Sequence, residues 1–139
     1  MITRLSHATI YVLDQEEALK FYRDKLGFEV RCDNTMEGGF RWLTVGPKTQ
    51  PDLELILMPA TESPMMSADK VARLRQMIAD GSMGTGVFTV DDCHKTYEEL
   101  VAKGVEFTYP PTERFYGIEA LMKDNSGNWF SMCQPKKWQ

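Results

Sequence analysis

The sequence has few of the residues and runs that mark several classes of protein. Its 139 residues include only three cysteines, widely spaced and without a CxxC pair, which indicates neither a disulfide framework nor a zinc knuckle. No apolar run approaches the roughly 20 residues that a membrane-spanning helix needs. The first residues also lack the charged region and the cleavage site of a signal peptide. We therefore expect a cytoplasmic protein with no membrane partner.

Positive charge and histidine are scarce as well. Sixteen Lys and Arg residues stand against twenty Asp and Glu, a net charge of −4, so the chain lacks the basic footprint of a nucleic-acid partner. The only histidines are His7 and His94. A transition-metal site must therefore rely largely on carboxylates, and a Ser-His-Asp or Cys-His arrangement has only these two histidines to use.

What the sequence does contain is the composition and patterning of one globular domain. Hydrophobic residues make up 42% and charged residues 26% of the chain, as in ordinary soluble domains. Period-two alternation predicts strands and apolar stripes at helical spacing predict helices, with Asp14 and Asp92 as N-caps. The predicted strands cover residues 4–12, 28–33, 39–45, 52–58, 85–90, 105–109, 118–123 and 128–133, and the predicted helices cover residues 14–26, 67–81 and 92–103.

The same order of elements occurs twice, which indicates an internal repeat. The segment LDQEEALKFYRDKLGFEV in the first half parallels VDDCHKTYEELVAKGVEF in the second. A displacement of 78 residues carries His7 onto Thr85, and one of 77 carries Glu54 onto Ser131. We therefore predict a single domain over 1–139 made of two modules, 1–60 and 83–139, joined by a connector, 61–82, with a short helix.

Four segments carry a resemblance to a known family: HATIYVLDQEEALKFYRDKLGFEV, DLELILMP, GVFTVDD and YGIEALMKDNSGNWFSM. Together they resemble the vicinal oxygen chelate superfamily, which groups glyoxalase I, extradiol dioxygenases, fosfomycin-resistance enzymes and bleomycin-resistance binding proteins. The resemblance implies an α+β fold of two βαβββ modules. Their curved, partly closed mixed sheet would surround a concave pocket, with the helices on the convex side and commonly a second chain in a homodimer.

Strand alternation indicates which residues face that pocket. Successive side chains of a strand point to opposite faces, and small or medium apolar residues such as Ala8, Ile10 and Val12 suit the helix-covered face. The opposite face mixes aromatic and polar groups, as a small-molecule site does. The predicted ligand-binding residues are His7, Thr9, Tyr11, Phe40, Trp42, Glu54, Met58, Thr85, Trp129 and Ser131.

The resemblance also implies where a metal would be bound. In metal-using members the ligands come from the first and fourth strands of each module, which places them at His7, Glu54, Thr85 and Ser131. The two hydroxyls are poor ligands, whereas a catalytic site usually has three protein ligands. We therefore expect no cofactor and no metal, and a divalent metal at His7 and Glu54 is the alternative.

Three functions follow from these residues. The first is a protein that binds or sequesters a planar or aromatic small molecule, similar to the bleomycin-resistance branch. The second is a metal-dependent lyase, isomerase or dioxygenase that uses His7 and Glu54. The third is an enzyme without a metal in which Glu54 or Glu119 is a general base, its pKa raised by an apolar pocket.

Each candidate residue also has a structural explanation. His7 fits a hydrogen-bonded strand histidine, and Glu54 fits an ion pair with a lysine or arginine as well as a pocket role. Glu119 fits a solvated strand position as well as the pocket. Core packing explains the aromatic residues as well as ligand stacking does, and His94 is expected to point to solvent.

Overall fold

The chain forms two compact units in a computed structural model that describes residues 1–137. The units are Met1–Gln76 and Met77–Gln139. The last two residues of the predicted second module, 138–139, lie outside the described residues. None of the helices within residues 1–137 is long and apolar enough to cross a membrane.

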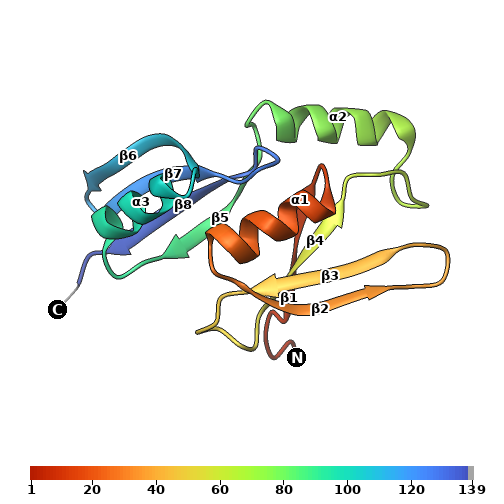
Figure 1. Cartoon of the computed structure of the whole chain (residues 1–139), viewed down its shortest axis with the longest axis horizontal. Helices are drawn as coiled ribbons and strands as arrows, with labels where there is room; N and C mark the ends of the chain where they lie inside the picture. Colours follow the sequence, from red (N-terminus) through yellow and green to blue (C-terminus); the bar gives the residue numbers. More distant parts are fainter. Residues whose placement is uncertain (138–139) are drawn as a thin grey trace. The chain divides into compact units, whose positions relative to one another are not determined.

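The first unit holds one complete βαβββ module (Figure 1). Its strands lie in the order β1-β4-β3-β2, with β1 parallel to β4 and the other neighbours antiparallel. Its elements are β1 (His7–Val12), α1 (Gln15–Lys20), the π-helical η1 (Phe21–Lys25), β2 (Glu29–Thr35), β3 (Arg41–Gly46) and β4 (Glu54–Pro59). A further helix, α2 (Ala68–Ala79), contains the boundary between the units.

The second unit repeats this arrangement. Its strands lie in the order β5-β8-β7-β6, again with a parallel outer pair, β5 with β8. Its elements are β5 (Gly84–Thr89), α3 (Cys93–Ala102), β6 (Glu106–Arg114), β7 (Gly117–Lys123) and β8 (Trp129–Pro135). The predicted α+β class with two βαβββ modules is therefore confirmed, as are all eight strands and three helices in their order.

The first helix and β6 differ most from the sequence prediction, while β1 begins at His7 rather than residue 4 and β3 at Arg41 rather than residue 39. The first helix ends in a π-helical segment, Phe21–Lys25, which the apolar stripe does not reveal. Strand β6 continues past Tyr109 to Arg114, with register shifts between Phe107 and Tyr109 and between Tyr109 and Thr112. Proline has no N–H to give to the ladder, yet Pro110 and Pro111 lie within the observed strand.

The helix of each module packs on one face of its sheet. Alternate strand residues are buried on that face in both units, together with apolar residues of α1 and α3. The buried residues of the helix-covered faces include Ile10, Val12, Leu43, Val45, Leu55 and Leu57 in the first unit and Ala120, Met122, Phe130 and Met132 in the second. At about 25 cal/mol per Å² of apolar surface removed from water, this packing is the main stabilising contribution within each unit.

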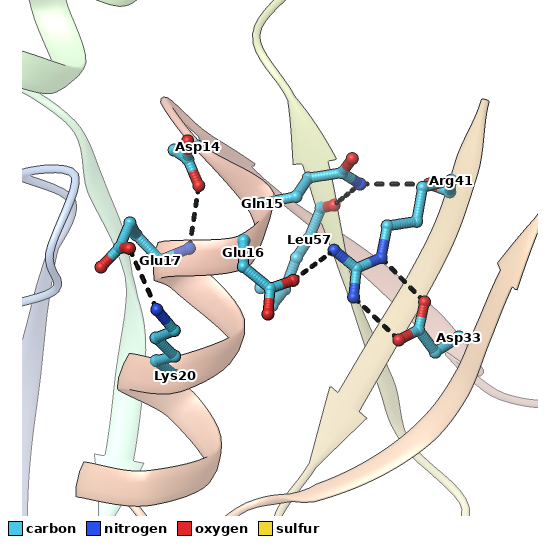
Figure 2. A network of polar contacts seen from close by, with 8 residues as sticks. All are labelled: Asp14, Gln15, Glu16, Glu17, Lys20, Asp33, Arg41 and Leu57. Carbon is cyan, nitrogen blue, oxygen red and sulfur yellow. Dashed lines mark hydrogen bonds and ion pairs between the residues drawn. The ribbon is translucent and has the colours of Figure 1, made fainter. Parts of the chain in front are cut away.

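A polar network ties α1 to three strands of the first unit (Figure 2). Arg41 of β3 donates two hydrogen bonds of 2.8 Å to Asp33 of β2 and one of 2.7 Å to Glu16 of α1. The Gln15 amide donates to the carbonyl oxygens of Arg41 and Leu57, at 3.0 and 2.9 Å. The helix therefore supplies donors to two carbonyls where β3 and β4 are no longer paired to each other.

A carboxylate organises the turn before β8 in the second unit. Asp124 is 5% exposed, and its Oδ1 accepts the backbone N–H groups of Ser126, Gly127 and Asn128, each at 2.9 Å. A Cβ on Gly127 would lie 2.2 Å from the carbonyl oxygen of Ile78, so only glycine fits there. This is the Asp-x-x-Gly-Asn turn seen in the sequence, and it fixes where β8 begins.

Replacing Gln15 tests whether α1 stabilises β3 and β4 where these two strands are no longer paired to each other. We expect Gln15→Leu to lower the free energy of unfolding by about 1–3 kcal/mol, because two partly buried carbonyl groups lose their donor. Chemical denaturation measures the loss. Lys20→Gln, which removes an exposed contact with Glu17, is the control, and an equal loss in both variants would contradict this role of Gln15.

Candidate functional site

The face of each sheet that points away from its helix, here called the non-helical face, carries most of the predicted site residues. In the first unit His7 pairs with Glu54 and Tyr11 with Met58 across β1 and β4, and their side chains share this face. Thr9 lies between His7 and Tyr11 on the same face and is exposed. Seven of the ten predicted ligand-binding residues therefore belong to this unit, and the alternation predicted for β1 and β4 agrees with the register.

Glu54 is the centre of the polar contacts on this face. Its Oε2 lies 2.9 Å from His7 Nε2, and its Oε1 accepts a hydrogen bond of 2.7 Å from the hydroxyl of Thr44. His7 Nδ1 lies 2.9 Å from the hydroxyl of Ser6. Glu54 therefore has a close side-chain partner, but that partner is His7 and not the lysine or arginine expected for an ion pair.

Aromatic residues flank this polar group. The rings of His7 and Trp42 are 6.3 Å apart, tilted by 48°. Trp42 shares its face with Thr44, whose partner across the sheet is Ile56. Phe40 lies outside the strand that the sequence predicted for it, in the turn before β3, and its side chain is 41% exposed. The structure brings Trp42, His7 and Glu54 together and places Phe40 beside β3.

The second unit does not reproduce the His7–Glu54 pair. The register pairs Ser131 with Val87, because the β5–β8 ladder shifts between Gly84 and Gly86. Thr85 falls in that irregularity, and its hydroxyl donates to the carbonyl of Met83. The expectation that Thr85 and Ser131 pair as His7 and Glu54 do is therefore wrong. The bulge in β5 leaves Thr85 without a partner in the β5–β8 register, and Ser131 lies opposite Val87.

Trp129 packs against the backbone of β5. A Cβ on Gly84 would lie 2.3 Å from Cζ2 of Trp129, so the indole ring occupies the space that a side chain at this position would take. Glycine at position 84 therefore leaves room for the indole ring of Trp129 against the strand. The ring shares the non-helical face with Ser131.

Glu119 gathers three hydroxyl groups in the second unit. Its Oε1 accepts hydrogen bonds from Tyr109 at 2.9 Å and from Tyr116 at 2.6 Å, and its Oε2 accepts one from Ser131 at 2.5 Å. Arg114 Nε lies 3.8 Å from Oε1. The side chain of Glu119 is only 13% exposed, so it does not occupy the solvated strand position that was the alternative for it.

The electrostatics of this cluster oppose a general-base role for Glu119. Burial raises the pKa of the Glu119 carboxyl, but the three hydroxyl hydrogen bonds outweigh burial and bring the pKa below its usual value. The hydrogen bond to Glu119 in turn raises the pKa of Tyr116 to about 12. The raised carboxyl pKa expected for a base at this position is therefore wrong for Glu119, which stays ionised near neutral pH.

Sequence reasoning missed Tyr109, Tyr116 and Arg114 as site residues. The guanidinium of Arg114 lies 5.3 Å from the ring centre of Tyr109, a cation–π arrangement. The one signal in the sequence was the aromatic and charged segment around Glu119, YPPTERFYGIE. Its pairing across the β6–β7 hairpin depends on the two register shifts, which no sequence pattern gave.

A hollow of about 500 Å³ opens at the end of the second unit's sheet. Its lining contains none of the predicted site residues, and Arg114 links it to the Glu119 cluster. The lining residues are Thr89, Val90, Asp91, Glu113, Arg114, Gly117, Ile118, Gln134, Pro135, Lys136 and Lys137. Charged residues of both signs line it, with Asp91 and Glu113 against Arg114, Lys136 and Lys137.

The residues present do not fit a catalytic metal centre. Within residues 1–137, no three His, Cys, Asp or Glu side chains are grouped where they could hold an ion. His7 and Glu54 are two good metal ligands, but their side chains contact each other. The hydroxyl of Thr44 donates a hydrogen bond to Glu54. Three protein ligands are usual for such centres, and this set is one short.

Comparison with known proteins agrees with this fold. The chain matches the glyoxalase/bleomycin resistance protein/dioxygenase superfamily over residues 4–132. It is 36% identical over 127 residues to the uncharacterised protein YurT of Bacillus subtilis (strain 168), an alignment that covers 91% of this chain and 94% of YurT.

Two solved structures are similar to both modules. The crystal structure of UcmS2 is 48% identical with a TM-score of 0.89, over 96% of this chain and 98% of that one. The structure of TnmS3, an antibiotic-binding protein from Streptomyces sp. CB03234, is 28% identical with a TM-score of 0.75, over 97% of this chain and 98% of that one. The chain therefore belongs to the glyoxalase/bleomycin resistance protein/dioxygenase superfamily, the group that its four sequence segments resemble.

Proposed function

We propose that this protein binds or sequesters a planar or aromatic small molecule and does so without a metal. The observation that carries the proposal is the make-up of the non-helical face of the first unit, where Trp42 lies beside the hydrogen-bonded pair His7 and Glu54. An aromatic surface with a few fixed polar groups is the usual composition of a small-molecule site.

The similarity to TnmS3 supports the same class of function. That protein binds an antibiotic, and it resembles this chain over both modules at 28% identity. Drug sequestration needs a shaped surface and no reactive group, which agrees with two carboxylates whose oxygens are already occupied by hydrogen bonds. The experiments below test which compounds bind.

The aromatic residues are the first test. We expect a planar aromatic compound to quench tryptophan emission saturably, and Trp42→Ala or Trp129→Ala to weaken its binding about three- to tenfold. Calorimetry on each variant measures affinity independently of the fluorophore that was removed. His94→Ala is the matched control, because His94 is exposed on α3. Equal affinity in all three variants would show that these rings do not contact the ligand.

Metal binding is the second test. We expect no sub-micromolar affinity for Zn²⁺, Ni²⁺ or Fe²⁺ in isothermal titration, because His7 and Glu54 lack a third strong ligand. Tight binding that His7→Ala abolishes would favour the alternative function, a metal-dependent lyase, isomerase or dioxygenase.

Assembly is the third test. We propose a homodimer, as is common among similar proteins, and such a pair would use the same surface of both chains about a two-fold axis. Light scattering at micromolar concentration should then give twice the chain mass of 15.9 kDa. A mass equal to that of one chain would refute this.

A further inference from the structure

The direction of the hydroxyl protons in the Glu119 cluster constrains which ligands it can bind. An ionised carboxylate only accepts hydrogen bonds, so Tyr109, Tyr116 and Ser131 must all donate to it. Each hydroxyl has a single proton. None of the three hydroxyls can therefore donate a hydrogen bond to a ligand. Each hydroxyl oxygen can only accept one.

Tyr116 is the member of the cluster best placed to use that capacity. Ser131 is buried, at 6% exposure. Tyr109 has Arg114 against its ring, with the guanidinium 5.3 Å from the ring centre. Tyr116 is less buried, and its chain neighbour Gly117 lines the hollow of about 500 Å³, a volume within the range of small-molecule sites.

The carboxylate of the first unit imposes the same direction. Thr44 gives its proton to Glu54. His7 Nε2 lies 2.9 Å from Glu54 Oε2, and an ionised carboxylate can only accept there, so Nε2 donates to it. In both units one carboxylate accepts hydrogen bonds from its neighbours.

We infer that the ligand bears hydrogen-bond donors, free hydroxyl or N–H groups on a planar aromatic frame, and that Tyr116, fixed by Glu119, accepts from one of them. The inference rests on the proposed function, and it concerns a ligand bound at the second unit, by the Glu119 cluster alone. An ether or carbonyl at the same place would set two acceptors against each other, and each would lose its hydrogen bond to water. Glu119 is a positioning residue in this account, since it touches the tyrosine and not the ligand.

A matched pair of probes tests the preference. We expect a naphthalenediol to bind about three- to tenfold more tightly than its dimethyl ether in calorimetric titrations, the worth of one hydrogen bond. Tyr116→Phe keeps the ring and should bring the ratio close to one. Tyr97→Phe, on α3 and packed against Phe107, should leave the ratio unchanged.

A second measurement follows the tyrosine without any ligand. In the wild-type chain the absorbance of tyrosinate should show a group that ionises near pH 12, since Glu119 raises the pKa of Tyr116 to about 12. Glu119→Gln should move that ionisation toward the ordinary value of about 10. An unchanged titration would overturn the inference, because Glu119 would then not hold the phenolic proton.

The outcomes distinguish a failure of this inference from a failure of the proposed binding function. Equal binding of the diol and the ether by the wild-type chain overturns the donor preference and leaves the proposed function intact. Failure of both probes and of other planar aromatics to bind, with the tyrosine titration as expected, overturns the function and the ligand chemistry together.

Discussion

In each βαβββ module the helix between the first two strands packs on one face of a four-stranded sheet, and it can cover only that face. Apolar side chains at alternate positions are therefore buried on the helix-covered face, and the other face mixes polar residues such as Glu54 and Glu119 with apolar ones. Period-two alternation makes this separation obligatory, since a slip of one residue would reverse every side chain. The non-helical faces, and every candidate site residue on a strand, follow from that constraint.

Polar side chains that are largely removed from water must satisfy one another. The two faces meet this requirement in the same way, with a single carboxylate that accepts from its neighbours: Glu54 from Thr44 and His7, and Glu119 from three hydroxyls. Such networks are ordered and specific, and they also neutralise the reactivity of the carboxylate. A surface of this kind is better suited to recognising a ligand than to removing its protons.

Much of the architecture was predictable from the residues. The N-caps Asp14 and Asp92 each accept from the backbone three residues on, and helices begin after both. The family resemblance placed His7 and Glu54 at ligand positions of the first and fourth strands, and the register pairs these two residues. Local patterns of this kind are readable because the physical cause lies within a few residues of the effect.

Other features depended on register that no local pattern encodes. The bulge near Thr85 removes the expected partnership with Ser131. The shifts in β6 bring Tyr109 within hydrogen-bond reach of Glu119, a residue ten positions later. Burial and hydroxyl hydrogen bonds compete at Glu119, and their balance reverses the direction of the pKa expected from burial alone.

The central claim is that the protein holds a small molecule without changing it. Native mass spectrometry after prolonged incubation with planar aromatic compounds, with and without divalent metal ions, tests this most directly. The account predicts a complex whose added mass equals that of an intact compound and from which the compound is recovered unaltered in both conditions. Recovery of a cleaved, isomerised or oxygenated product that depends on the protein and the metal would contradict it.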